Sequence, residues 1–150
     1  MSVKDIDLGW SKLFREMKEL DKKAVKVGIQ AGETTEDGEN DLAYIGGVHE
    51  FGSEDGTIPK RSFIRAGVDN KMGEIKKLSQ IVSGKIIDGM TVNTGLNLIG
   101  LEVTGIIQEY ISSGNFAPLK PKTIARKGSS KPLIDTGHLR QSIRHVLEDW

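Results

Sequence analysis

The spacing of apolar residues predicts that the chain opens with a helix followed by a strand. In residues 6–20 the apolar side chains recur three and four positions apart, with Lys and Glu between them, which is the pattern of an amphipathic helix entered at Asp5 or Asp7. In residues 25–29 apolar and other residues alternate, as in a half-buried strand. The apolar positions of the helix are Trp10, Leu13, Phe14, Met17 and Leu20.

A second helix is predicted over residues 42–51, whose apolar residues share one face and which Gly52 is placed to end. A turn follows at residues 54–56. Pro59 then disfavours helical backbone for the residue before it. We therefore expect residues 61–65 to form a short strand or an extended arm.

The middle of the chain predicts a helical hairpin. Residues 69–88 and 92–112 both have helical apolar periodicity, and the two helices would run antiparallel around a turn at residues 84–91. An interior glycine costs about 1 kcal/mol relative to alanine, so glycines retained in such a helix indicate close approach of another backbone. The glycines of the second helix are Gly95, Gly100 and Gly105.

The last part of the chain combines a basic arm with a short helix and a strand. Residues 115–132 contain several bases and prolines but no acid, which predicts an extended arm. After it, Asp135 or Thr136 would cap a short helix that carries Leu139, and residues 142–147 alternate well enough for a strand. The bases of the arm are Lys120, Lys122, Arg126, Lys127 and Lys131.

Together these elements predict a single domain of the α+β class over residues 1–150. A small twisted sheet, antiparallel or mixed, would pack with the N-terminal helix and the long hairpin, leaving extended loops and the arm. The 21 Lys and Arg residues balance the 21 Asp and Glu residues, so the chain is not a polycation overall, and its zero net charge favours self-association. The balance is uneven along the chain, because residues 31–41 form an acidic loop.

The composition also excludes several classes of protein. The absence of cysteine excludes disulfides, thiolate metal sites and a cysteine nucleophile. No apolar run approaches the ~20 residues that span a bilayer, and the start does not resemble a secretory signal, so we expect no membrane partner and a protein made and kept in a cytoplasm. Eighteen glycines are well above the usual share of about 7%.

Two sets of residues could carry chemistry, and both are weak candidates. His49 and Glu50 lack the second histidine, four positions on, that a zinc hydrolase needs, because residue 53 is Ser. Asp135, His138 and Ser142 contain the residue types of a nucleophilic triad, but one helical row rarely makes three groups converge. With no phosphate-binding glycine loop either, the sequence predicts no enzyme, no cofactor and no metal.

The basic arm leaves three interpretations open. Its bases could contact nucleic acid phosphates, although the arm lacks the interleaved aromatic residues that stack on bases. It could equally dock on an acidic protein patch, such as residues 33–41 of a neighbouring copy. It could also be a plain solvated linker.

Two segments resemble one protein family. The first joins residues 25–29 to Ala43-Tyr-Ile-Gly-Gly-Val-His-Glu-Phe-Gly52 and Ile58-Pro-Lys-Arg-Ser-Phe-Ile-Arg65, and the second runs from Ala117 to Gly128 and then from Lys131 to Ile143. They are similar to the tailed-bacteriophage virion-morphogenesis group of tail-completion, neck and head–tail joining proteins. The resemblance covers a little under half of the chain. In many relatives the Thr-Gly-x-Leu motif precedes the His-Glu-Phe-Gly motif, whereas here it follows.

The resemblance implies a virion protein, assembled in the host cytoplasm, that forms a ring at the head–tail junction, commonly a hexamer. Its partners would be other copies of itself, the head adaptor and the tail terminator or tail tube, with DNA passing non-specifically through the lumen; a tail terminator ring is the alternative station. The residues that match are His49, Glu50, Phe51 and Gly52, then Ile58, Pro59, Arg61 and Phe63, and lastly Leu133, Asp135, Thr136, Gly137, Leu139 and Ser142.

The residue types suggest what the arm after Gly52 does. Its extended exit would project Arg61, Phe63 and Arg65 away from the helix, and an aromatic residue between two arginines is typical of a subunit interface. The alternative for Phe63 is a place in the core of the monomer. The function hypotheses are therefore a non-enzymatic phage structural protein, a small hydrolase and an electrostatic DNA-binding module through the basic arm.

Overall fold

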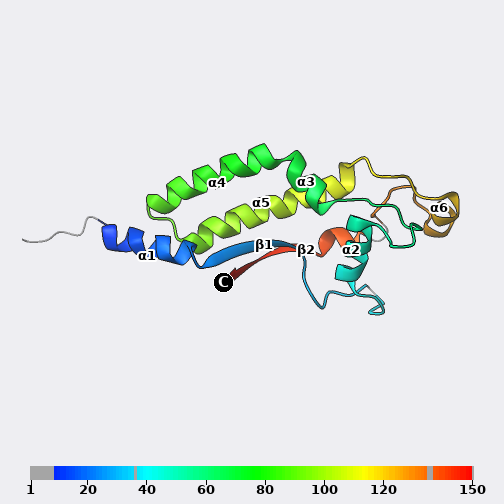
Figure 1. Ribbon diagram of the computed structural model, residues 1–150, viewed down its shortest axis with the longest axis horizontal. Helices are drawn as coiled ribbons and strands as arrows, with labels where there is room; N and C mark the ends of the chain where they lie inside the picture. Colours follow the sequence, from blue (N-terminus) through cyan, green and yellow to red (C-terminus); the bar gives the residue numbers. More distant parts are fainter. Residues whose placement is uncertain (1–8, 36, 135–136, 150) are drawn as a thin grey trace, which may run out of the picture.

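The computed structural model describes residues 9–35, 37–134 and 137–149, which form helices and a two-stranded sheet along an elongated axis (Figure 1). This is the predicted α+β class. In chain order the elements are α1 (Trp10–Leu20), β1 (Lys23–Ile29), α2 (Leu42–Phe51), α3 (Ile64–Asn70), α4 (Met72–Ile87), α5 (Val92–Ser113), α6 (Pro121–Lys127), α7 (His138–Gln141) and β2 (Ile143–Asp149).

The sheet pairs the first strand with the last. β1 and β2 are antiparallel, with Lys23 opposite Asp149 and Ile29 opposite Ile143. Because strand side chains alternate between faces, Val25 and its partner Leu147 share the face that packs on the helices. Both predicted strands are confirmed within two residues at each end.

The predicted hairpin of α4 and α5 is confirmed. α5 runs between α4 and the sheet (Figure 1), and it packs on both. Thr91 begins α5 by accepting the backbone N–H of Thr94 on its hydroxyl at 3.2 Å. The prediction of one helix over residues 69–88 is wrong in one respect, because the segment contains parts of two helices. α3 ends before Lys71 and α4 begins after it. The buried apolar residues of this half are Val82, Ile86, Val92 and Leu96.

Two of the three glycines of α5 lie at close contacts. A Cβ on Gly95 would come within 2.7 Å of Val82, and one on Gly100 within 2.5 Å of the His145 ring. Tight packing is therefore confirmed at these two glycines, but the predicted backbone neighbour is wrong, because the nearest atoms belong to side chains. At Gly105 no described atom beyond its own helical turn lies within 4 Å of such a Cβ, so packing within the subunit does not use this glycine, and packing between subunits stays a prediction.

A second apolar cluster fills the other half of the molecule. It surrounds the C-terminal half of α5 and draws on segments far apart in the sequence. Its buried members are Phe63, Ile107, Ile111, Leu133, Leu139 and Ile143. This cluster packs both segments of the family resemblance around one helix.

Two predictions of extended backbone are wrong in part. Residues 61–63 are irregular, but the helix α3 begins at Ile64, so the arm is shorter than residues 61–65. The basic arm contains α6, which Pro121 begins at a position that needs no N–H donor and Gly128 ends with a φ of 71°. Pro121 and Gly128 are a helix start signal and a helix stop signal in the sequence, and they outweigh the tendency of a proline-rich stretch to be extended.

α1 is anchored to the hairpin through a buried acid. It begins at Trp10, with Gly9 as its N-cap; Asp5 and Asp7, the predicted entry residues, lie outside the described residues. Its inward residue is Glu16, whose carboxylate accepts the backbone N–H of Val92 at 3.0 Å. Glu16 therefore satisfies a donor in the first turn of α5.

Candidate functional site

The carboxylate of Glu50 caps α3 from the end of α2. It accepts hydrogen bonds from the Ser62 hydroxyl at 2.6 Å and from the backbone N–H groups of Phe63, Ile64 and Arg65 at 2.7, 2.9 and 3.2 Å. These N–H groups lie at the start of a helix, where donors have no intrahelical partner. Glu50 is only 7% exposed, so its side chain is a buried part of the fold.

The ionisation of Glu50 matches this capping role. Burial by itself would raise the pKa of the carboxyl group, but the hydrogen bonds from Ser62 and the three backbone N–H groups outweigh it and lower the pKa below its ordinary value of 4.5. Each carboxylate oxygen already accepts two hydrogen bonds. Glu50 is thus an ionised structural group, which weakens the interpretation of His49-Glu50 as a hydrolase pair.

Arg61 fastens the basic arm to the end of α2. Its guanidinium donates from Nε to the carbonyl of Ala117 at 2.8 Å and from Nη2 to that of Pro118 at 3.1 Å. Its backbone N–H donates to the His49 carbonyl at 2.7 Å. Arg61 is 6% exposed, and burial lowers its pKa from the usual value. One residue therefore joins three segments of the chain.

The expectation that Arg61, Phe63 and Arg65 project away from the helix is wrong for the first two. Phe63 is fully buried, in contact with the core around Ile107, which confirms the alternative of a place in the core of the monomer. The reason is that Glu50 captures the backbone at residues 63–65 and turns the chain inward, where the ring gains more by burial than by exposure. Arg65 alone of the three remains exposed, on α3.

The other residues that match the first motif lie on the surface around the end of α2. Phe51 is 73% exposed, and Ile58 and Pro59 are exposed as well. Gly52 ends the helix as predicted, with a φ of 87° and with the Lys60 backbone nitrogen 3.2 Å from where a Cβ would stand. A side chain at this position would meet both strain and a steric conflict.

The second motif packs into the same core as the first. Leu133 and Leu139 are buried beside Phe63. Gly137 is the N-cap of α7. Asp135 and Thr136, which were expected to cap this helix, lie outside the described residues. The structure thus brings residues of the two motifs together in one apolar cluster.

The row of residues 135–142 does not present a nucleophile. Ser142 is 2% exposed, and its hydroxyl donates to the Leu139 carbonyl at 2.8 Å. A hydroxyl held in this way has no access to a substrate. Together with the position of Asp135 outside the described residues, this leaves the triad hypothesis without geometric support.

A groove of about 510 Å³ lies where the two motifs, the acidic loop and the basic arm meet. His49 and His138 line it, and burial together with the positive charges of Arg61 and Lys127 lowers the pKa of His49 below its ordinary value. Asp37 of the acidic loop and Arg126 of the arm line the same groove. The acidic loop and the basic arm therefore share one end of the subunit (Figure 1).

Four of the five bases of the arm are exposed, and two of the five are tied to backbone carbonyls. The Lys120 ammonium donates to the carbonyl of Thr57 at 3.2 Å, and that of Lys127 to the carbonyl of Lys131 at 2.9 Å. Lys122, Arg126 and Lys131 are exposed. These three side chains are the ones placed to contact a phosphate or an acidic surface.

Within the described ranges, no cluster of three or more His, Asp or Glu side chains is arranged to hold a metal ion. None of the helices in this part of the chain is long and apolar enough to cross a bilayer.

The exposure of the apolar face of α1 was not predicted from the sequence. An amphipathic helix as a rule buries its apolar face, yet Trp10, Phe14 and Met17 are 64%, 58% and 56% exposed. The helix is turned so that Glu16 faces the hairpin instead. Helical periodicity shows that a face exists but does not say what covers it.

Comparison with known proteins adds no relative. No protein-family model, curated protein or solved structure matches this chain.

Proposed function

We propose that this chain is a non-enzymatic structural protein of a tailed-phage virion that forms a ring, commonly a hexamer, at the head–tail junction. It would join tail to head and let DNA pass through its lumen, after assembly in the host cytoplasm. The resemblance of the two motifs supports this proposal. The observation that carries it is the amount of apolar surface that one subunit leaves uncovered.

That surface is formed by large apolar side chains on several elements. Monomeric proteins rarely expose extended apolar patches, and such patches commonly mark sites of protein association. On α1 the row of Trp10, Phe14 and Met17 is more than half exposed. Other large apolar side chains are exposed at separate positions along the chain, and they are Leu20, Tyr44, Phe51, Ile58, Ile81, Ile87, Leu98 and Leu101.

The sheet gives a second reason to expect association. In the described part of the chain it has two strands, so β1 and β2 each have one hydrogen-bonded neighbour. Two strands are a marginal sheet by themselves, and an unpaired edge is a site where another chain adds. Contact between copies would cover both edges and apolar faces.

The test is the oligomeric state of the purified protein. We expect light scattering after gel filtration to give a discrete oligomer at moderate concentration or on addition of the head or tail partner, and electron micrographs to show rings. A monomer under all these conditions would overturn the proposal. Binding of the ring to isolated heads, rather than to tail tubes alone, distinguishes a neck protein from a tail terminator.

A further inference from the structure

The groove of about 510 Å³ that lies between α2 and α6, which we call the α2–α6 groove, has the size and lining of a ligand site. Sites for small organic molecules have volumes of about 300–1,000 Å³ and are mostly apolar, with a few polar groups. Here the polar side chains of His49, Thr123 and Arg126 stand among aliphatic ones. The aliphatic residues of the lining are Leu42, Ile45, Leu119, Leu133 and Leu139.

His49 brings a hydrogen-bond donor to the α2–α6 groove. Burial and the positive charges of Arg61 and Lys127 lower the pKa of its ring, so the ring is neutral at pH 7 and carries one proton. Its Nδ1 is buried and has no hydrogen-bond partner among the described residues. A buried N–H without an acceptor is rarer than a buried acceptor without a donor, so the proton belongs on Nε2. Since Nδ1 is closed off, the ring lines the groove with its other edge, where this N–H is a free donor.

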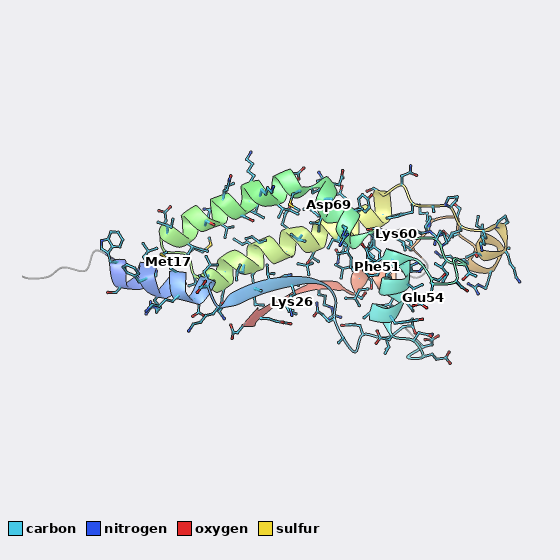
Figure 2. All side chains as sticks on the ribbon, in the orientation of Figure 1. Met17, Lys26, Phe51, Glu54, Lys60 and Asp69 are labelled. Atoms are coloured by element: carbon cyan, nitrogen blue, oxygen red, sulfur yellow. The ribbon has the colours of Figure 1, made fainter. Side chains whose placement is uncertain are left out.

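α6 adds two further donors on one of its faces. Thr123 and Arg126 are three positions apart in the helix, so their side chains are neighbours, and both line the groove. Within the described part of the chain neither side chain has a hydrogen-bond or ion-pair partner. None of the described residues of α6 is buried, so the helix lies over the groove without a side chain in the core. Figure 2 shows the side chains of α6 at the end of the subunit where Glu54 and Lys60 are labelled.

Positive charge predominates around these donors. Arg126 lines the groove, and Arg61 is close enough to His49 to lower its pKa. The Arg61 guanidinium donates to two neutral carbonyls, so these bonds do not offset its charge. Among the described lining residues the one acid is Asp37, whose carboxylate is held by hydrogen bonds within its own loop. Donors without acceptors, in a region of positive charge, are suited to an anion.

This set of donors suits a phosphate monoester better than a carboxylate. A guanidinium pairs with either group through two parallel N–H bonds. A phosphate monoester carries a charge of about −1.5 to −2 and three acceptor oxygens, whereas a carboxylate has a single charge and two oxygens. The monoester therefore offers an oxygen to each of His49, Thr123 and Arg126 and offsets more of the positive charge. The aliphatic lining is left for the organic group of the ester.

We propose that the α2–α6 groove binds an organic phosphate monoester. Nε2 of His49, the Thr123 hydroxyl and the Arg126 guanidinium hold the phosphate, and the aliphatic side chains contact the organic group. The groove lies within one subunit, so this inference goes beyond the proposed function and does not depend on a ring. The monoester is either a free phosphate compound or the 5′-phosphate at the end of a DNA strand.

Phenyl phosphate is the first probe, because it joins a phosphate monoester to a small apolar group. We expect calorimetry with the whole chain to show one site per subunit, and NMR to show a shift of the His49 ring signals. Inorganic phosphate should bind at least about tenfold more weakly, because it leaves the aliphatic lining uncovered. Benzoate should also bind more weakly. Absence of binding by phenyl phosphate, or equally tight binding of benzoate, would overturn the proposal.

Two variants on α6 locate the site. Arg126→Met removes the guanidinium and should lower the affinity for phenyl phosphate at least about tenfold, since hydrogen bonds to charged groups are the strong ones. Lys122→Met is the matched control: Lys122 is exposed on the same helix but does not line the groove, so the affinity should hardly change. An equal loss in both variants would mean that general positive charge attracts the probe, and the site would be wrong.

Two variants of His49 test its Nε2 donor. His49→Leu removes the donor, and His49→Gln places an amide N–H near the position of Nε2. The affinity for phenyl phosphate should therefore fall in the first variant and largely return in the second. Circular dichroism checks that both variants fold. Equal losses in two folded variants would contradict the role of the Nε2 donor.

Asp37→Asn gives a result that a purely structural role would not produce. The change removes the acid from the lining but keeps a side-chain oxygen to accept the hydrogen bonds of its loop. Binding of phenyl phosphate should become tighter, because the anion no longer faces a negative charge. An unchanged or weaker affinity would contradict the placement of the phosphate in this groove.

The source of the monoester is decided with short single-stranded DNA made with and without a 5′-phosphate. Binding that requires both the 5′-phosphate and Arg126 assigns the groove to a DNA end. Equal binding of the two DNA strands, together with binding of phenyl phosphate, assigns it to a free phosphate compound. A protein that binds phenyl phosphate but stays monomeric would overturn the proposed ring and leave this site intact, and a ring that does not bind the probe would do the reverse.

Discussion

Glu50 and Phe63 are joined by a hydrogen bond in which the Phe63 backbone N–H donates to the carboxylate at 2.7 Å, across 13 positions of sequence. This bond sets where α3 begins and directs the Phe63 ring into the core. A pair of residues that the sequence offered as a candidate for catalysis and for an interface therefore acts first as a fold determinant.

Replacing Glu50 with alanine should destabilise the protein. It leaves three helix N–H groups and the Ser62 hydroxyl without their acceptor, so we expect the free energy of unfolding to fall by about 1–3 kcal/mol. Urea denaturation measures the change. Glu54→Ala is the matched control, because Glu54 is exposed, and its effect should stay within about 0.5 kcal/mol.

The contribution of Glu50 should depend on pH. Its pKa is lowered in the folded state relative to its ordinary value of 4.5, so its stabilisation is present above about that pH and is lost as the pH falls through the folded value. The stability difference between the wild-type protein and Glu50→Gln should therefore shrink in acid. A difference that is constant from neutral pH into strong acid would contradict the capping role.

Two of the three glycines of α5, Gly100 and Gly105, should respond oppositely to alanine. At Gly100 the new methyl group would lie 2.5 Å from the His145 ring and 2.8 Å from Val25, and such overpacking costs about 1–3 kcal/mol. The methyl group of Gly105→Ala would meet no described atom beyond its own helical turn, so this change should gain up to about 1 kcal/mol in helix propensity. Thermal unfolding of the two variants at low concentration makes the comparison, and equal effects would refute the packing at Gly100.

Arg61→Met should loosen the start of the basic arm. Methionine replaces the aliphatic stem of Arg61 with an unbranched apolar side chain. It removes the charged donors to the Ala117 and Pro118 carbonyls, at a cost of about 1.5–3 kcal/mol. Hydrogen exchange in the arm measures the loosening, and urea unfolding measures the loss of stability. The control Arg126→Met affects an exposed arginine and should be nearly silent.

If α6 contacts DNA in the lumen, the exposed bases should control its salt dependence. Lys122, Arg126 and Lys131 changed together to alanine should reduce the slope of log affinity against log salt by about 0.9 for each phosphate that is no longer neutralised. Lys76, Lys77 and Lys85 on α4 provide a control with the same change in charge. Duplex binding that ignores salt, or that both triple variants lower equally, would exclude a specific role for α6.

Much of the fold follows from local patterns in the sequence. The helical period of α5 and the alternation in β1 and β2 each follow from which side chains are buried, so the pattern indicates both the element and its buried positions. Gly52 could be predicted as the end of α2 because glycine readily adopts a positive φ. What these signals cannot give is the partner of each face.

The roles of the candidate-site residues were harder to predict, because they depend on partners that are distant in the sequence. Glu50 looks like a polar residue beside a histidine, and only the path of the chain after Pro59 brings the N–H groups of α3 to it. Glu16 is hidden within an ordinary amphipathic pattern, although it is buried and binds Val92. Contacts between distant positions decide both roles, and periodicity carries no information about them.

The pairing of β1 with β2 has a consequence for the order of folding. Lys23 and Asp149 lie 126 positions apart, yet they face each other in the sheet and are ion-paired. A ribosome must therefore release nearly all the described elements before the sheet can close, whereas α4 and α5, which are adjacent, can pair early. During synthesis β1 has both edges open, so a nascent chain is most exposed to wrong partners until its last strand arrives.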